Sequence, residues 1–189
     1  MALEIERKFL VRGDRWRSEA GVGVAMRQGY LRGFGSGRSV AAAGSGEDTT
    51  GSGDGAAGGG AVVRVRLTGA DAWLTIKGPT EGIRREEFEY PLPPDDARAM
   101  LARLCESGII EKVRYRIEFA GWSWEVDEFL GKNAGLVVAE IELPSEDADP
   151  DLPSWVGQEI SDDPRFFNSS LSARPYGVWG AAQGSGLND

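Results

Sequence analysis

The sequence predicts a mainly β (α+β) protein, in which eight short antiparallel strands form a closed barrel, a tunnel with a charged lumen and a few flanking helices. Three observations predict this fold. Many short segments alternate between apolar and charged residues, helical periodicity is scarce, and acidic and basic side chains are separated onto different strands. Eight strands joined by short turns are typical of an antiparallel sandwich or barrel.

The expected strands occupy residues 4–10, 26–31, 62–67, 73–77, 85–92, 111–120, 122–129 and 136–143. Successive residues of a strand point to opposite faces, so residues i and i+2 share a face. Arg64 and Arg66 therefore share one face, opposite Val63, Val65 and Leu67. The same alternation places only charged residues on one face of strand after strand.

An ordinary sheet, with its apolar face buried and its charged face in water, explains any one of these strands. Two features favour a barrel for the whole set. A surface that only confers solubility mixes acids with bases, whereas here the signs are separated by strand. The chain also has too little helix to cover the apolar faces of eight strands in an open sheet. We therefore expect charged faces inside, and apolar faces outside under helices and loops.

Two helices are expected. Apolar residues at positions 97, 100, 101, 104 and 105 form the stripe of an amphipathic helix over 95–105, between a proline pair and Gly108. Cys105 lies on that stripe, so we interpret it as a core residue. Asp163 and Pro164 are suited to start a second, short helix.

The composition of the 189 residues limits the chemistry. This length suits one domain with a core of its own. Histidine is absent and Cys105 is the one cysteine. These facts exclude Ser-His-Asp and Cys-His catalysis, histidine-ligated zinc and an intrachain disulfide. Any metal must be a hard cation held by carboxylates. The cysteine usage favours a reduced compartment, which we take as the cytoplasm, with an organelle lumen as the alternative.

The net charge of −9 is uneven along the chain. Residues 143–189 carry eight acids and two bases, whereas residues 1–34 and 62–142 together are nearly neutral. This acidic balance argues against binding to nucleic acid or anionic lipid. No apolar run has the roughly 18 residues that a membrane span needs. We therefore expect no nucleic-acid partner and no membrane association.

Residues 35–61 differ from the rest in composition, since 20 of these 27 residues are Gly, Ala or Ser. Such a segment cannot bury enough apolar area to offset its ordering entropy, so we expect a disordered insertion. A phosphate-binding glycine loop is disfavoured, because the segment leads into a strand and offers no lysine. The expected tunnel domain is 1–179 with this insertion, and 180–189 is a flexible tail.

The inward faces of the barrel would gather many charges. Arginine and lysine suit a ligand with several phosphates, since arginine binds phosphate oxygens bidentately. Carboxylates beside such a ligand would repel it unless divalent cations lay between them. The basic set is Lys8, Arg64, Arg66, Lys77, Arg85, Lys112 and Arg114; the acidic set is Glu4, Glu6, Glu87, Glu89, Glu125, Asp127, Glu140 and Glu142. An oligophosphate held by such cations and bridged by metal is set up for phosphoryl transfer.

These residues resemble the CYTH superfamily of triphosphate tunnel metalloenzymes. The ExExK signature is present as Glu4-Ile5-Glu6-Arg7-Lys8. Further matching landmarks follow in order: Gln28–Leu31, Arg64–Arg66, Thr75–Gly78, Arg85–Glu89, Glu111–Tyr115, Trp124–Asp127, Ala139–Glu142 and the block Asp163–Leu171. The resemblance covers nearly the whole chain except 35–61 and the tail. It is closest to the bacterial-type, single-domain members.

The resemblance implies an eight-stranded antiparallel tunnel that binds triphosphate with Mg²⁺ or Mn²⁺. It assigns metal binding to Glu4, Glu6, Asp127, Glu140 and Glu142, and triphosphate binding to Lys8, Arg64, Arg66, Lys77, Arg85, Lys112 and Arg114. The implied activity is hydrolysis of inorganic triphosphate to pyrophosphate and phosphate. Homodimerisation is compatible with the resemblance.

The catalytic group and the substrate stay open at this point. Lys8 and Tyr30 are both candidates for the general base, and each must be activated by burial or neighbouring cations. Tyr30 could equally pack in the barrel and donate a hydrogen bond. The alternatives to inorganic triphosphate are an organic substrate, as in a thiamine triphosphatase or class IV adenylate cyclase, and a non-catalytic module that binds polyphosphate or nucleotides.

Overall fold

Nine strands and two α-helices make up most of the described part of the chain. The computed structural model describes residues 3–31, 61–105 and 108–179. The expected tail, and the expected insertion apart from Ala61, lie outside them. The strands are β1 (Leu3–Val11), β2 (Val24–Tyr30), β3 (Val62–Thr68), β4 (Asp71–Lys77), β5 (Arg84–Leu92), β6 (Ile110–Phe119), β7 (Trp122–Phe129), β8 (Val137–Glu142) and β9 (Val156–Glu159). The α-helices are α1 (Pro94–Arg103) and α2 (Asn168–Ala173), and short 3₁₀ helices span Arg15–Ser18, Gly131–Asn133, Pro164–Phe166 and Tyr176–Val178.

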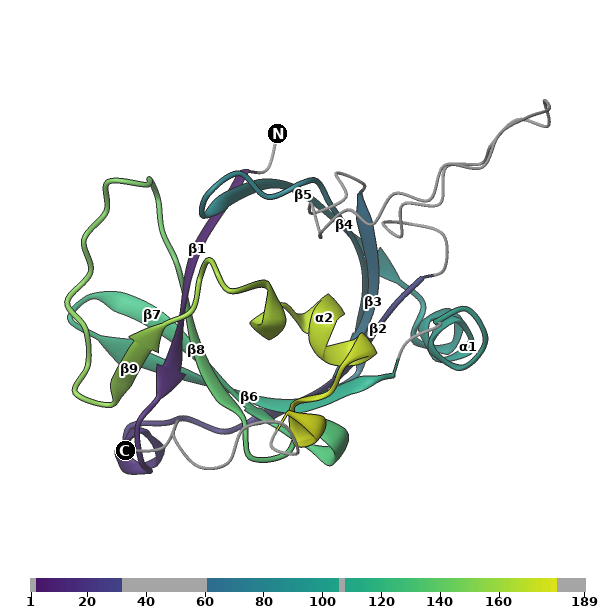
Figure 1. Ribbon diagram of the computed structural model, residues 1–189. Coiled ribbons are helices and arrows are strands. Elements are labelled where there is room, and N and C mark those ends of the chain that lie inside the picture. The colour runs from purple at the N-terminus through teal and green to yellow at the C-terminus, as the bar shows by residue number, and fades with distance from the viewer. Residues whose placement is uncertain (1–2, 32–60, 106–107, 180–189) are drawn as a thin grey trace, which may run out of the picture.

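Strands β1 to β8 form a closed antiparallel barrel, as Figure 1 shows in a view along its axis. The order of neighbours is β5-β4-β3-β2-β6-β7-β8-β1, and pairing of β1 with β5 closes the ring. Every pairing between neighbours is antiparallel. The predicted fold class is therefore confirmed, and all eight expected strands are present within two residues of their predicted ends.

The outward faces of the barrel are apolar, also as expected. Helix α1 packs its Ala97 and Leu101 against Val65 and Leu67 of β3. On the other side, Trp124 of β7 and Phe9 of β1 pack against Trp155 from the segment that precedes β9. The charged faces consequently turn inward.

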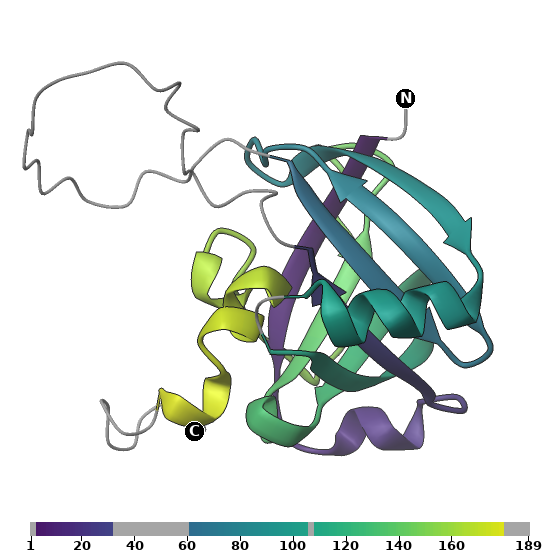
Figure 2. The ribbon, with the colours of Figure 1, turned by 90° about the vertical axis from the view of Figure 1, so that its right-hand side faces the viewer.

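One end of the barrel is filled by apolar side chains. Two residues beyond the inward-facing Lys112 and Asp127, the same faces carry Ile110 and Phe129, both buried. These residues form an apolar cluster with Val138, Leu136, Ile160, Phe166 of the 3₁₀ turn and Leu171 of α2. Figure 2 shows the C-terminal helices lying across that end of the barrel. The charged lumen therefore opens toward one end, and the other end is plugged, which the sequence did not reveal.

The ninth strand was not predicted. The N-terminal half of β1 pairs with β5, whereas its C-terminal half pairs with β9 through Phe9 and Val11. The two strands come very close, because a Cβ on Gly157 would lie 2.7 Å from the carbonyl oxygen of Leu10. Glycine permits this approach, and β9 protects an edge that β5 leaves open.

The helices follow the sequence pattern with small shifts. Helix α1 begins at Pro94 and ends at Arg103, so Cys105 lies just beyond it, half-buried beside the apolar cluster under α1. The start expected at Asp163 is a 3₁₀ turn, whose Arg165 amide donates to the Asp163 carboxylate, and α2 follows it. Among the residues described, no helix is long and apolar enough to cross a membrane.

Candidate active site

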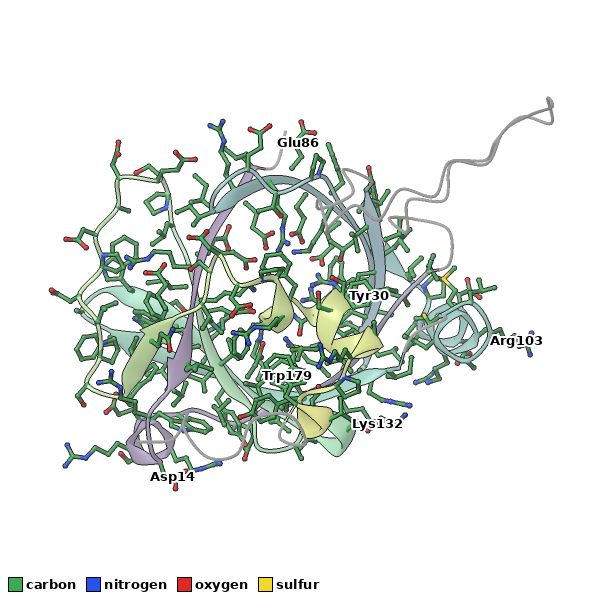
Figure 3. All side chains as sticks on the ribbon, in the orientation of Figure 1. Asp14, Tyr30, Glu86, Arg103, Lys132 and Trp179 are labelled. Carbon is green, nitrogen blue, oxygen red and sulfur yellow. The ribbon has the colours of Figure 1, made fainter. Side chains whose placement is uncertain are left out.

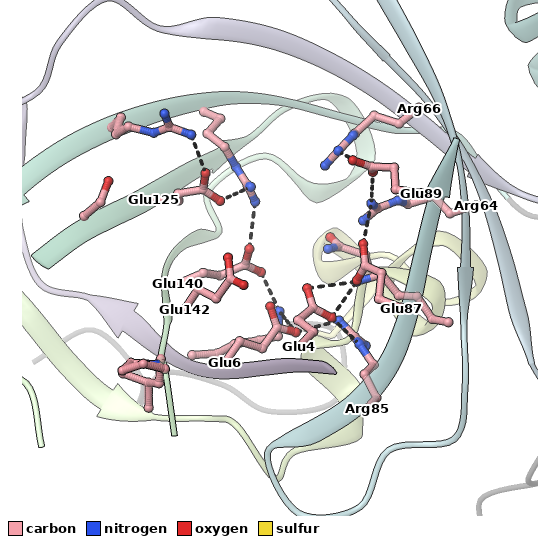
Figure 4. A pocket seen from close by; sticks show the side chains of 18 residues that line it. Glu4, Glu6, Arg64, Arg66, Arg85, Glu87, Glu89, Glu125, Glu140 and Glu142 are labelled. Carbon is pink, nitrogen blue, oxygen red and sulfur yellow. Dashed lines mark hydrogen bonds and ion pairs between the residues drawn. The ribbon is translucent and has the colours of Figure 1, made fainter. Parts of the chain in front are cut away.

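The barrel encloses a charged cavity of about 660 Å³. Seven cationic and seven acidic side chains line it, and Figure 4 shows them converging from the surrounding strands. The lining residues are Lys8, Arg64, Arg66, Lys77, Arg85, Arg114 and Arg116, then Glu4, Glu6, Glu87, Glu89, Glu125, Glu140 and Glu142, with Ser123, Leu143, Pro144 and Asn168. None of these lining residues is aromatic. Charged residues at other positions, such as Asp14, Glu86, Arg103 and Lys132, lie at the periphery (Figure 3).

The lining side chains of β1, β4 and β5 form a dense network of ion pairs, in which four carboxylates face three cations. Arg85 bridges the carboxylates of Glu4 and Glu6 with contacts of 2.6 Å each, and Lys77 Nζ lies 3.0 Å from Glu4. Burial lowers the pKa of Lys77, and the neighbouring guanidinium groups of Arg64 and Arg85 lower it further. Arg64, Lys77 and Arg85 therefore lie close enough together to act on one anionic group.

A chain of ion pairs crosses the barrel from β1 to β6. Lys8 Nζ lies 2.6 Å from Glu140 on β8, and Arg114 of β6 contacts the other oxygen of Glu140 at 2.7 Å. Burial opposes the charge on each of these groups. The pKa of Glu140 nevertheless falls well below its usual value, because Lys8 and Arg114 stabilise the carboxylate. The pKa of Lys8 rises, since Glu140 and Glu6 outweigh burial.

Lys112 and Asp127 lie beneath this chain rather than on the cavity surface. Both are buried and form an ion pair, and Asp127 also receives two hydrogen bonds from Arg114, at 2.7 and 2.6 Å. Burial lowers the pKa of Lys112 to about 8, against the opposing attraction of Asp127. The arrangement fixes the guanidinium of Arg114 from behind while its other contacts face the cavity.

A second cluster of inward side chains comes from β3, β4 and β5. The carboxylate of Glu89 accepts hydrogen bonds from Arg66 at 2.8 Å and from the Thr75 hydroxyl at 3.0 Å. Arg64 donates to the same hydroxyl at 3.0 Å. Because residues 64 and 66 share a strand face, both guanidinium groups reach the cavity with little freedom to move.

The acidic side chains offer carboxylate oxygens, which are suitable ligands for a hard divalent cation. Glu6 and Glu142 stand directly opposite each other on β1 and β8, where two like charges destabilise a sheet. Burial, together with Glu4, Glu125 and other carboxylates nearby, raises the pKa of Glu142. In the part of the chain that the structure describes, no three acids are grouped as a ready-made metal site. Most of these carboxylates contact a lysine or an arginine. A divalent metal ion would therefore compete with the basic side chains for the carboxylates.

Tyr30 lies on the inner side of β2 but is not part of the cavity surface. Its hydroxyl accepts a hydrogen bond from the Gln28 amide at 3.1 Å. Burial raises the pKa of Tyr30 to about 12, despite the nearby cations Arg64 and Lys8. Its phenol is therefore protonated at neutral pH.

The structure brings together most of the residues that the sequence singled out. Of these, Lys112, Asp127 and Tyr30 adjoin the cavity without lining it. Sequence reasoning did not assign Arg116, Ser123 or Asn168 to the site. Strand alternation was the available signal for Arg116, which shares a face with Arg114. No periodic signal marks Asn168, because it is the first residue of the short helix α2.

Comparisons with known proteins agree with this geometry. The family model of the CYTH domain matches residues 50–176. The inorganic triphosphatase of Acetivibrio thermocellus is 44% identical over 93% of this chain and 97% of its own, and that of Nitrosomonas europaea is 32% identical over 58% and 74%. The solved structure of the inorganic triphosphatase NE1496 has a TM-score of 0.55 and 28% identity, over 91% of this chain and 95% of that one. The chain therefore belongs to the CYTH family.

Proposed function

We propose that the chain hydrolyses inorganic triphosphate to pyrophosphate and phosphate, with Mg²⁺ or Mn²⁺ as the cofactor and residues 1–179 as the catalytic domain. The observation that carries this proposal is the cavity itself, whose lining combines seven cations with seven carboxylates and has no aromatic residue. A triphosphate fills such a site with negative charge along its whole length. The names of the two curated relatives give independent support.

In this proposal, two groups of cations bind different parts of the triphosphate. Arg64, Lys77 and Arg85 hold one part of the triphosphate, and Arg66, Lys8 and Arg114 hold the remainder. The groups are already fixed by ion pairs, so they need little reorganisation when charge develops in the transition state. Asp127 and Lys112 act from behind by orienting Arg114.

The proposed metal ligands are Glu4, Glu6, Glu140 and Glu142, with Asp127 as the most buried carboxylate beside them. When bound, the metal would supply positive charge that polarises the phosphoryl oxygens. Within the protein, the carboxylates would exchange contacts with arginine and lysine for contacts with the cation, which frees the basic groups for the phosphates. This exchange explains why a tunnel with equal numbers of acids and bases suits a polyanion.

The first test is phosphate release from tripolyphosphate, ATP and thiamine triphosphate, each with Mg²⁺, Mn²⁺ or EDTA. We expect fast turnover of tripolyphosphate that EDTA abolishes, and weak turnover of both organic substrates, because the lining offers no aromatic platform for a base or thiamine ring. Preference for an organic substrate would redirect the assignment. Tight binding without turnover under any metal would indicate a binding module.

Lys8 and Tyr30 are the proposed catalytic candidates, Lys8 as a cation that stabilises developing charge, because its raised pKa keeps it protonated, and one pair of variants tests the two roles. We expect Tyr30→Phe to keep kcat/KM for tripolyphosphate within a factor of about five, because the change removes one neutral hydrogen bond. The raised pKa of Tyr30 argues against a phenolate at neutral pH. Lys8→Met should lower kcat by about 100-fold or more, since it removes a buried charge from the site. A loss of about 100-fold or more in Tyr30→Phe would instead assign general-base catalysis to the phenol.

A further inference from the structure

The C-terminal segment contributes one polar side chain to the cavity, and the proposed reaction gives it no role so far. Asn168, the first residue of α2, lines the cavity at its plugged end. The segment is firmly held, because Leu171 is fully buried in the apolar plug and Gly108 donates a backbone hydrogen bond of 2.9 Å to the Ser172 carbonyl. The position of Asn168 is therefore set by packing.

The amide of Asn168 has unmet hydrogen-bonding capacity. Its Oδ1 is buried without a partner, and its side chain makes no hydrogen bond with any residue that the structure describes. Buried polar atoms in folded proteins are nearly always paired. An amide can offer two N–H donors as well as a carbonyl oxygen. The Nδ2 donors of Asn168 also have no partner among the described residues, and they, rather than the acceptor Oδ1, could pair with an anion bound in the cavity.

The shape of the lumen identifies that partner. Along β6 the inward face runs from Ile110 in the plug, through Lys112 and Arg114, to the exposed end at Arg116, a distance of roughly 20 Å at the usual rise per residue. The end at Arg116 therefore offers an entrance to a linear anion. Its leading group stops against the plug, where Asn168 lies.

We infer that the Asn168 amide donates a hydrogen bond to the terminal phosphoryl group of the bound triphosphate and thereby sets the register of the chain along the tunnel. This inference rests on the proposed function. In this role Asn168 is a specificity-determining residue. It offers a neutral donor at the point where the plug removes the last water from the phosphate, and it places the anhydride bonds opposite Lys8 and Arg114.

The test compares Asn168→Asp and Asn168→Ala with Ser169→Asp, which adds the same charge one residue further on, outside the cavity lining. We expect Asn168→Asp to raise KM for tripolyphosphate by about 100-fold and Asn168→Ala by about tenfold, as for loss of a hydrogen bond to a charged group. Ser169→Asp should change KM by less than about twofold. Thermal melting without ligand should be similar in all variants, because a merely structural role of Asn168 would lower it.

A second readout keeps this inference separate from the proposed function. The dissociation constant of tripolyphosphate in EDTA, measured by calorimetry, should rise in the same order as KM. If the wild-type chain hydrolyses tripolyphosphate but Asn168→Asp binds it as tightly as the wild type does, the inference is wrong and the function stands. If the wild type shows no hydrolysis, the proposed function fails, and the calorimetric series alone decides whether Asn168 contacts the anion.

Discussion

Replacement of Arg85 by methionine is expected to lower kcat/KM for tripolyphosphate by about 100- to 1,000-fold, the usual cost of losing one preorganised donor in a site of this kind. Arg85 holds Glu4 through its Nε and Glu6 through Nη2, each at 2.6 Å. Methionine keeps an unbranched apolar stem, shorter than that of arginine, and removes both contacts. The two carboxylates then lose a shared cation, and the triphosphate loses a guanidinium, so binding and turnover fall together.

The adjacent residue provides the matched control. Arg84 faces outward, is 48% exposed, and pairs at the surface with Glu81 at 3.2 Å and Glu146 at 3.5 Å. Exposed pairs of this kind contribute about 0–1 kcal/mol, so Arg84→Met should keep kcat/KM within about twofold. Steady-state kinetics on both variants, with circular dichroism to confirm folding, measures the contrast. Equal activity in the two variants would mean that the inward face of β5 does not bind substrate.

Strand alternation explains why so much of the site could be predicted from the sequence. Once 64–66 and 112–116 are recognised as strands, a period of two decides which side chains point inward, and no tertiary information is needed. The charge pattern predicts closure of the barrel, because charged faces turned inward indicate a lumen that encloses a charged ligand. This reasoning gives the wall of the cavity, strand by strand.

The parts that were missed depend on contacts between distant segments. Ile110 and Phe129 continue the inward faces of Lys112 and Asp127, so alternation alone extends the lumen through them. Only the packing of Leu171 and Phe166 turns that end into a plug. Strand β9 escaped prediction because Val156–Glu159 has four residues and too little alternation to register. Asn168 escaped because its role depends on where the C-terminal segment lies.

Alternation also overstates the number of residues that touch substrate. Alternation places Lys112, Asp127 and Arg114 equally on the inward face of the barrel. In the structure, however, Lys112 and Asp127 are buried beneath Arg114 and pair with each other. Depth along the barrel axis is set by the strand tilt and by the plug, and neither is visible in the sequence. The distinction matters for experiments, because a buried pair and a cavity residue respond differently to substitution.

Asp127→Asn is expected to destabilise the fold by about 3–5 kcal/mol, because it leaves the buried Lys112 without its counter-charge, whereas Arg114 keeps Glu125 and Glu140. Asp127 is fully buried and contacts both Lys112 and Arg114. For a chain of this size the change corresponds to a fall in Tm of about 10 °C. Activity should fall as well, since Arg114 loses the contacts that orient it.

A double variant tests this account of Asp127. Lys112→Met combined with Asp127→Asn removes the most buried cation, while the asparagine oxygen can still accept a hydrogen bond from Arg114. The double variant should therefore be more stable than Asp127→Asn alone by about 1–2 kcal/mol, a coupling within the range measured for neighbouring groups. Glu125→Gln is the control on the same face of β7, where the carboxylate is 29% exposed and the expected loss is about 1 kcal/mol or less. If the double variant is the least stable of the three, Lys112 contributes packing rather than an unpaired charge, and its role beneath Arg114 must be mainly steric.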